Sequence, residues 1–305
     1  MIRFDDRVAI VTGAGIGLGR SHALGLAARG AKVVVNDLGV DANGVGCSSA
    51  AANAVVDEIE ALGGESFANG ADVSNSEQVI DMINQTMQRW GRIDILVNNA
   101  GILRDKSFAK MSLDDFSKVV DVHLTGSANC CHSVWPIMQK QKYGRIVLTS
   151  SASGLYGNFG QSNYGAAKAA MVGLMNVLHH EGVRDDIRVN TLAPSAATRM
   201  TQNLVPEAAH DLLAPEKITP GLLYLVSEDS PTKTILSAGA GCFAQTRIFE
   251  TEGVMIKGDI TPETVAQNWK KITDPAGQTE IPDAFIQTRK FAKRAAEAHK
   301  IKLNW

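Results

Sequence analysis

Short apolar segments rich in β-branched residues alternate with longer segments of helical periodicity up to about residue 240. Nearly continuous apolar runs such as Lys32–Asn36 are typical of strands that are buried on both faces. These runs predict strands at Val8–Val11, Lys32–Asn36, Ser66–Asn69, Ile93–Val97, Arg145–Thr149, Arg188–Leu192 and Thr234–Ser237. The intervening segments predict helices near Gly17–Arg29, Ser49–Leu62, Ser76–Trp90, Leu113–Lys140, Gln161–Glu181 and Pro220–Val226. This alternation predicts an α/β fold, a Rossmann-type doubly wound parallel sheet over residues 1–241.

The alternation stops after Gly241, where turn residues and charges become more frequent. Thr261–Ile272 has the pattern of a capped helix, with Thr261 as N-cap and Pro262 at the first helical position. Ala284–His299 predicts a second, basic helix. About 60 residues are too few for a strong independent core. We therefore expect residues 242–305 to form a C-terminal helical extension that packs on the main domain or on a partner subunit.

Charge and composition exclude several classes of protein. The 305 residues include 30 Lys and Arg against 32 Asp and Glu, a net charge of −2, so we expect neither a nucleic-acid partner nor a membrane surface. No apolar run is long enough to span a membrane and charges interrupt the N-terminal apolar stretch, so we expect a cytoplasmic protein. The cysteines lack metal-site spacing and are expected to be reduced core thiols: Cys47, Cys130, Cys131 and Cys242.

A glycine-rich segment, TGAGIGLG, lies between the first predicted strand and the first predicted helix. Glycines at such a junction let the backbone turn tightly and bring its amide groups against a pyrophosphate at the helix N-terminus. The spacing is GxxxGxG, and a plain glycine-rich turn is the alternative. The candidate dinucleotide-binding residues of this segment are Gly13, Gly15, Ile16, Gly17 and Gly19.

Acidic residues follow two further predicted strands. Asp37 ends the second strand, where a carboxylate can accept hydrogen bonds from both ribose hydroxyls of adenosine and would repel a 2′-phosphate. The sequence therefore favours NAD(H) over NADP(H), although Arg20 complicates this choice and a turn-capping role for Asp37 is the alternative. Asp72 and Val73, after the third strand, are expected beside the adenine.

The fourth predicted strand is followed by two amide residues and a glycine. Asn99, Ala100 and Gly101 stand at its carboxyl end, which suits a place where the backbone meets a cofactor. A plain turn is the alternative.

A tyrosine and a lysine share one face near the start of a predicted helix. Tyr164 and Lys168 are four positions apart, so the ammonium is expected to lower the pKa of the phenol toward the working range. Such a phenol can exchange a proton with a carbonyl or an alcohol. Ser151, at the end of a strand upstream, can hold the substrate oxygen near it. An ordinary helix pair is the alternative for the tyrosine and lysine.

These ordered motifs resemble those of the short-chain dehydrogenase/reductase superfamily over roughly residues 4–241. The resemblance implies that Ser151, Tyr164 and Lys168 form a catalytic triad. It also implies that the glycines of TGAGIGLG line the pyrophosphate and that Asn99 holds the central strands and the cofactor.

The sequence departs from the superfamily pattern at two places. His123 stands where the superfamily has a fourth catalytic residue, an Asn that holds a proton-relaying water. A neutral histidine would keep a polar role, in the relay or as a structural hydrogen bond, whereas a protonated one would repel Lys168. The segment that begins with Pro194 has no glycine after the proline, and Thr198 in it is expected to approach the nicotinamide carboxamide.

Longer stretches, such as QKYGRIVLTSSASGLYGNFGQSNY, resemble one branch of the superfamily, the (3R)-hydroxyacyl-CoA dehydrogenase unit of peroxisomal multifunctional enzymes of type 2. This resemblance implies NAD-dependent oxidation of a 3-hydroxyacyl-CoA or a steroid-derived substrate. A hydroxysteroid or general alcohol dehydrogenase that needs no CoA is one alternative, and a non-catalytic dinucleotide sensor is another.

The substrate and the assembly are less closely specified by the sequence. The expected substrate loops, 102–110 and 198–216, carry basic residues that either meet a CoA phosphate or are solvated surface charges: Arg104, Lys106, Lys110 and Arg199. The resemblance implies a homodimer paired through the helices at Leu113–Lys140 and Gln161–Glu181. Aromatic residues of the extension are expected to dock on the main domain or across the dimer.

Overall fold

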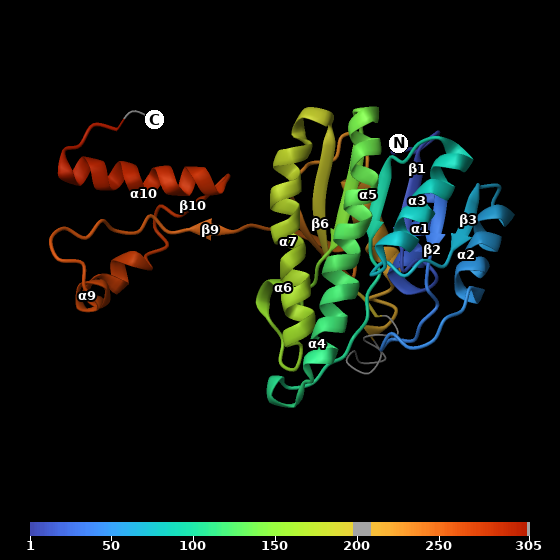
Figure 1. Cartoon of the computed structure of the whole chain (residues 1–305), viewed down its shortest axis with the longest axis horizontal. Coiled ribbons are helices and arrows are strands. Elements are labelled where there is room, and N and C mark those ends of the chain that lie inside the picture. Colours follow the sequence, from blue (N-terminus) through green and yellow to red (C-terminus); the bar gives the residue numbers. More distant parts are fainter. Residues whose placement is uncertain (198–208, 304–305) are drawn as a thin grey trace. The chain divides into compact units, whose positions relative to one another are not determined.

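The computed structural model of the chain describes residues 1–197 and 209–303, and its main element is an eight-stranded sheet (Figure 1). The strands are β1 (Val8–Thr12), β2 (Lys32–Asn36), β3 (Ser66–Asn69), β4 (Ile95–Asn98), β5 (Gly144–Thr149), β6 (Ile187–Ser195), β7 (Ile235–Gly239) and β8 (Cys242–Thr246). Their order is β3-β2-β1-β4-β5-β6-β7-β8, and each neighbouring pair from β3 to β7 is parallel. The chain winds outward in both directions from the β1–β4 junction, so the predicted doubly wound fold is confirmed.

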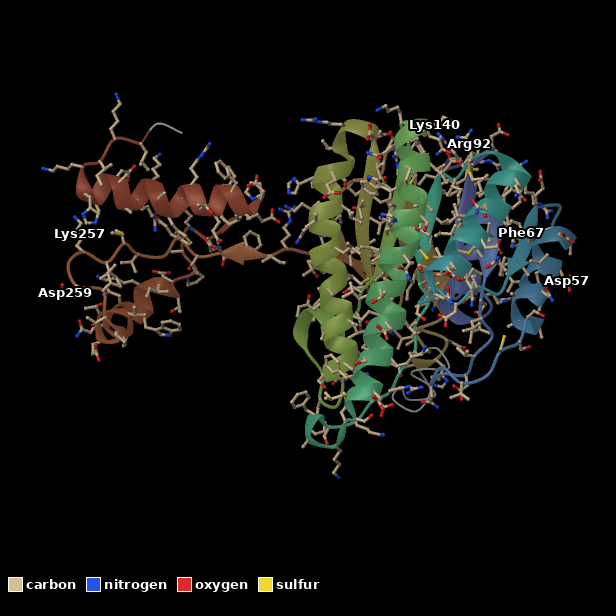
Figure 2. The ribbon with its side chains drawn as sticks, in the orientation of Figure 1. Asp57, Phe67, Arg92, Lys140, Lys257 and Asp259 are labelled. Carbon is tan, nitrogen blue, oxygen red and sulfur yellow. The ribbon has the colours of Figure 1, made fainter. Side chains whose placement is uncertain are left out.

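Helices cover both faces of this sheet. One face carries α1 (Gly17–Ala27), α2 (Ala50–Ala61) and α8 (Thr219–Leu225). The other face carries α3 (Ser76–Trp90), α5 (Gly126–Gln141) and α7 (Ser162–Gly182), while α4 (Leu113–Val120) and the short α6 (Ala152–Tyr156) lie against α7 (Figure 1). Charged residues such as Asp57 of α2 and Lys140 of α5 lie on the outer surfaces of the helices (Figure 2).

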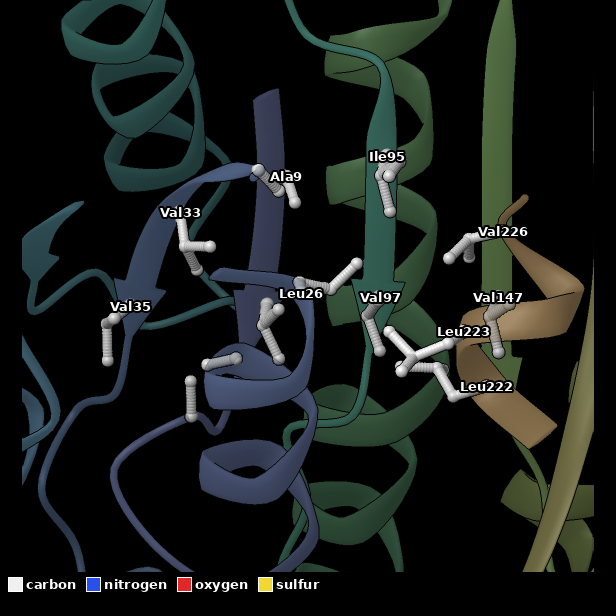
Figure 3. Packing of buried hydrophobic residues seen from close by; sticks show 14 of the residues in the cluster. Ala9, Leu26, Val33, Val35, Ile95, Val97, Val147, Leu222, Leu223 and Val226 are labelled. Carbon is white, nitrogen blue, oxygen red and sulfur yellow. The ribbon is translucent and has the colours of Figure 1, made fainter. Parts of the chain in front are cut away.

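Neighbouring residues of a strand point to opposite faces, so each central strand contributes to two apolar cores. Ala9 of β1 packs in one core with Leu26 of α1 and Leu222 of α8 (Figure 3). Ile10, the next residue, packs in the other core, which includes Met138 of α5. Burial on both sides is the physical reason for the unbroken apolar runs in the sequence.

The long helix predicted at Leu113–Lys140 is interrupted in the structure. α4 ends at Val120, a π-helical turn covers Asp121–Thr125, and α5 begins at Gly126. A π-turn widens the helix by one residue and is often found at functional sites. Here it contains His123, whose side chain is buried.

The sheet gains an eighth strand beyond the predicted end of the main domain. Ala240 and Gly241 both have positive φ, 51° and 78°, and connect β7 to β8 as a two-residue turn, which brings β8 back antiparallel to β7. The chain divides into two compact units, Met1–Gln245 and Thr246–Trp305. Because β8 pairs with β7, the first unit extends to Gln245, beyond the predicted boundary at residue 241.

The second unit contains β9 (Phe249–Glu250) paired antiparallel with β10 (Thr279–Glu280), and two helices, α9 (Pro262–Ile272) and α10 (Ala284–His299). Thr261 caps α9 as predicted, since its hydroxyl accepts a hydrogen bond from Thr264 N. Ion pairs such as Lys290 Nζ–Glu250 Oε1 (2.8 Å) join α10 to β9. The large aromatic side chains of this unit remain about half exposed: Phe249, Trp269, Phe285 and Phe291.

The prediction for the cysteines can be compared with the structure. Cys130 and Cys131 are buried, as expected for core thiols, but Cys47 and Cys242 are exposed, so the prediction is wrong for these two.

Among residues 1–197 and 209–303, no helix is both long and apolar enough to cross a membrane. The same part of the chain contains no cluster of three or more potential metal-ligating His, Cys, Asp or Glu residues.

Candidate active site

A cavity of about 460 Å³ opens at the carboxyl ends of the central strands. This is the edge of an open α/β sheet at which ligands bind. The cavity wall includes ten of the predicted cofactor-binding residues: Gly13, Ile16, Gly17, Gly19, Asp37, Asp72, Val73, Asn99, Ala100 and Gly101. The structure therefore brings together residues from the loops after β1, β2, β3 and β4.

The glycines allow the backbone of the β1–α1 turn to approach its neighbours closely. Gly13 and Gly17 have positive φ, 63° and 56°. A Cβ on Gly19 would lie 2.1 Å from the carbonyl oxygen of Gly13, and one on Gly13 would lie 2.8 Å from Cα of Ala100. Side chains would fill this cradle, which ends at the N-terminus of α1, so it fits the pyrophosphate of a dinucleotide.

Thr12 and Asn99 join the two strands that flank the cavity. Thr12 Oγ1 accepts hydrogen bonds from the backbone N of Asn99 and of Ala100, each at 3.0 Å. Asn99 Nδ2 donates to the carbonyl oxygens of Thr12 and Gly13, also at 3.0 Å. Asn99 therefore fixes the glycine turn to the end of β4.

Asp37 lies in the cavity wall, and its carboxylate is hydrogen-bonded to the surrounding backbone. Its two carboxylate oxygens accept hydrogen bonds from Gly15 N and from Gly39 N, both at 2.7 Å. Gly15 packs closely on it, because a Cβ there would meet Asp37 Oδ2 at 2.8 Å. The carboxylate thus has a fixed position in the cavity wall.

Asp72 and Val73, which follow β3, also belong to the cavity wall. Asp72 Oδ1 accepts hydrogen bonds from the backbone N and the hydroxyl of Ser74, which makes it the cap of a turn. The carbonyl oxygen of Val73 accepts from Asn129 Nδ2 at 3.0 Å. Both residues are held by α5 and by the local turn.

Ser151, Tyr164 and Lys168 come together beside this cavity. Ser151 follows β5 and caps α6, where its hydroxyl accepts from Ser153 N at 3.2 Å. Lys168 Nζ donates to the carbonyl oxygen of Thr149 at 2.6 Å and lies 5.6 Å from the ring centroid of Tyr164. Tyr164 packs against an apolar cluster that includes Ile102, and Ile102 belongs to the cavity wall.

The pKa values of the phenol and the ammonium differ from the sequence-based expectation. Burial lowers the pKa of Lys168 to about 7. Burial also raises the pKa of Tyr164, a hydrogen bond with Ser151 lowers it, and the charge of Asp105 raises it further. The predicted lowering of the phenol pKa is therefore wrong in this structure, because burial disfavours the phenolate more than the hydrogen bond with Ser151 favours it.

His123 lies against Tyr164. Its ring is perpendicular to that of Tyr164, with centroids 5.3 Å apart, and a Cβ on Gly101 would touch it at 2.2 Å. Nε2 lies 3.1 Å from N and 2.9 Å from O of Ile102, while Nδ1 has no partner in the part of the chain that the structure describes. Burial and the charge of Lys168 lower the pKa of His123 to about 3, so the ring is neutral.

The structure describes some of the remaining predicted residues and not others. Pro194 lies near the end of β6, paired with Ala238 of β7. Thr198 and Arg199 lie outside the described residues. Lys110 is exposed at the end of a short 3₁₀ helix, Phe108–Lys110.

Two of the basic residues considered as CoA ligands are already paired. Arg104 Nη1 and Lys106 Nζ contact the two carboxylate oxygens of Asp115, at 3.0 and 3.2 Å. Asp115 holds them because Ser112, the N-cap of α4, fixes the start of that helix.

Sequence reasoning missed two polar residues that precede Tyr164. Asn163 is fully buried, and its Oδ1 accepts a hydrogen bond from Tyr164 N at 2.7 Å. Gln161 donates to Asp105 Oδ2 at 2.6 Å and accepts from Ser153 Oγ at 2.7 Å. Both lie within the segment NFGQSNY, and the bond from Gln161 to Asp105, 56 positions away, is one that only the fold reveals.

The sequence profile of short chain dehydrogenases matches residues 7–209. The chain belongs to this family. Over 290 residues, 92% of its length, it is 47% identical to the peroxisomal hydratase-dehydrogenase-epimerase of Saccharomyces cerevisiae, of which it covers 32%. The chain thus spans about a third of the length of that relative.

Two solved structures of the family are similar. The full-length peroxisomal multifunctional enzyme type 2 of Drosophila melanogaster shares 36% identity with a TM-score of 0.81, covering 97% of this chain and 50% of that one. A 7α-hydroxysteroid dehydrogenase in complex with NADH and 7-oxo glycochenodeoxycholic acid shares 31% identity with a TM-score of 0.71, covering 78% of this chain and 95% of that one. The chain is therefore an oxidoreductase of the short chain dehydrogenase family.

Proposed function

We propose that this chain is an NAD-dependent dehydrogenase that interconverts a secondary alcohol and a ketone, with a 3-hydroxyacyl-CoA as substrate. The observation that carries the proposal is the junction at Ile102. This residue belongs both to the wall of the dinucleotide cavity and to the apolar cluster that packs on Tyr164. A coenzyme in the cavity and a substrate at the phenol would therefore meet.

The coenzyme would be held by backbone and by carboxylate. The turn of Gly13, Gly17 and Gly19 would receive the pyrophosphate, and Asp37 would accept from the adenosine ribose. The fixed charge of Asp37 supports NAD over NADP, and the NADH in the related hydroxysteroid dehydrogenase agrees with this choice. When bound, NAD⁺ supplies the acceptor for the hydride of the alcohol.

The chain's own residues would handle the proton. Tyr164 would take the hydroxyl proton in oxidation and return it in reduction, with Ser151 orienting the substrate oxygen. The raised pKa of Tyr164 keeps the phenol protonated at neutral pH, which suits reduction, and oxidation is expected to speed up as pH rises. His123, neutral and bonded to Ile102, would hold the shape of the site, and Nδ1 offers a place for a relay water.

The substrate class comes from the relatives. The name of the yeast relative combines a dehydrogenase with a hydratase and an epimerase, the insect relative is a multifunctional enzyme, and this chain matches only part of each. A hydroxysteroid substrate is the second candidate, supported by the similar 7α-hydroxysteroid dehydrogenase. A cytoplasmic location stays a prediction, and the names of several relatives contain the word peroxisomal.

A kinetic panel tests the proposal. The full chain would be assayed with NAD⁺ and NADP⁺ against (3R)- and (3S)-3-hydroxyacyl-CoAs, hydroxysteroids and simple secondary alcohols. We expect the highest kcat/KM with NAD⁺ and a (3R)-hydroxyacyl-CoA. A hydroxysteroid that is used far better would support the second candidate, and preference for NADP⁺ would refute the coenzyme assignment.

We also propose a homodimer formed through α5 and α7. On α7, Ala166, Ala169, Gly173 and Val177 are exposed on one side, and their spacing allows a close approach of two helices, whereas Ala167 faces the core. The half-exposed aromatic residues of the extension would be covered in the assembly. A chain ending at Gln245 is expected to aggregate or to lose substrate affinity, as light scattering and kinetics would show. If it stays soluble, dimeric and fully active, the extension is dispensable.

A further inference from the structure

Residues 38–48 form a loop that closes one side of the dinucleotide cavity. Its two ends touch, because Ser48 N donates to the carbonyl oxygen of Leu38 and a Cβ on Gly39 would lie 1.8 Å from the carbonyl oxygen of Ser48. Between these ends, the cavity wall includes Val40, Asp41, Gly44 and Gly46. The loop is thus long, pinched at its base, and in contact with the space that a coenzyme would fill.

The tip of this loop is attached to the segment after β4. Asp41 Oδ1 accepts from the backbone N of Asn43 and Val45, which folds the tip into a turn. The carbonyl oxygen of Ala42 then accepts from Leu103 N at 2.9 Å, and that of Asn43 accepts from Arg104 Nε at 3.1 Å. The wall of the cavity therefore depends on contacts with Leu103 and Arg104.

Arg104 also connects to the catalytic helix. Its guanidinium donates through Nη1 to Asp115 Oδ1 of α4 at 3.0 Å, and its carbonyl oxygen accepts from Asn163 Nδ2 at 3.0 Å. Asn163 in turn accepts from Tyr164 N. One residue thus contacts the coenzyme loop, α4 and the residue that precedes the catalytic tyrosine.

We propose that Arg104 is a positioning residue that couples the 38–48 loop to Tyr164, and that it does not bind the phosphates of CoA. This inference rests on the proposed function, since it assumes a coenzyme in the cavity. The guanidinium is about a quarter exposed and two of its nitrogens are already bonded in different directions. A planar fork can satisfy Asn43 and Asp115 at once, whereas a lysine ammonium reaches one of them well.

The test compares Arg104→Lys with Lys106→Gln in the full chain. Lys106 shares Asp115 with Arg104 but has no side-chain bond to the loop among the described residues, so it is the matched control. Arg104→Lys should raise the Kd for NADH about tenfold, the scale of one lost charge-assisted hydrogen bond, and should lower kcat at saturating NAD⁺. Lys106→Gln should leave the Kd for NADH within about twofold of the wild type.

The choice of substrate separates positioning from phosphate binding. With a 3-hydroxyacyl thioester of N-acetylcysteamine, which has no phosphates, Arg104→Lys should lose as much kcat as with the CoA thioester. If the variant raises only the KM for the CoA thioester and leaves the Kd for NADH unchanged, Arg104 binds phosphate and the coupling is refuted. If the wild type binds no NADH, the proposed function itself fails, and the coupling fails with it. If the wild type binds NADH and the variant behaves as a phosphate-binding residue predicts, only the coupling fails, so the two failures are distinguishable.

Hydrogen exchange in the wild type tests the coupling without a variant that has to fold. On addition of NADH, peptides covering residues 38–48, 102–106 and 161–165 should gain protection together. Protection of residues 38–48 alone, with no change at 102–106 and 161–165, would overturn the coupling.

Discussion

The buried ammonium of Lys168 should make the stability of the protein depend on pH. Its side chain is 4% exposed and burial lowers its pKa from 10.5 to about 7. In the unfolded chain this lysine holds its proton up to about pH 10.5. Between these two values the unfolded state binds more protons, so the free energy of unfolding rises with pH. Stability is lost as the pH falls through the folded pKa near 7.

The magnitude follows from the two pKa values. A change of one pH unit within this interval is worth about 1.4 kcal/mol, so the full effect is on the order of 5 kcal/mol. Between about pH 6 and about pH 9, the stability of the wild type relative to Lys168→Met should rise by about 3 kcal/mol. The methionine keeps an unbranched side chain of similar length and removes the titration.

Urea unfolding of the wild type and of Lys168→Met at several pH values measures this difference. Lys140 is exposed, so the variant Lys140→Met is the control. The free energy of unfolding of this variant should change with pH in the same way as that of the wild type. Parallel pH dependences for the wild type and Lys168→Met would refute the argument, because they would mean that Lys168 titrates alike in the folded and unfolded chains.

Other predictions concern the coenzyme and the proton. Asp37→Asn should reduce the ratio of kcat/KM for NAD⁺ to that for NADP⁺ at least about tenfold, and steady-state kinetics with an unchanged ratio would show that the charge does not select the coenzyme. Gly19→Ala should weaken NADH binding at least about a hundredfold because its Cβ meets the Gly13 carbonyl, whereas Gly70→Ala, where a Cβ meets nothing within 4 Å, should bind normally in the same titration. For alcohol oxidation, kcat/KM should increase with pH above neutrality because the pKa of Tyr164 is raised, and a profile that falls in this range would contradict the phenol as base.

The sequence was sufficient for the features that depend on local pattern. Lys32–Asn36 and Ser76–Trp90 begin and end where the apolar periodicity and the turn residues predict. The segment TGAGIGLG predicts its own geometry, because positive φ at Gly13 and Gly17 needs glycine whatever surrounds it.

Features that depend on distant partners could not be predicted in this way. The pairing of Arg104 with Asp115 and with the tip of the 38–48 loop joins residues separated by 11 and 61 positions. The π-helical turn at Asp121–Thr125 was not predicted, because the pattern of Leu113–Lys140 predicts one continuous helix. The pKa of Tyr164 depends on how deeply the fold buries it, and a spacing of four residues to Lys168 carries no information about burial.

The most direct test of the central claim is the formation of NADH from NAD⁺ and a (3R)-hydroxyacyl-CoA by the wild type and by Tyr164→Phe. The wild type should form NADH, and the variant should turn over at least about a hundredfold more slowly, the scale of losing a general acid/base, while its Kd for NADH stays unchanged. Turnover by Tyr164→Phe at the wild-type rate would contradict the account, because the proton would then have to be transferred by another group.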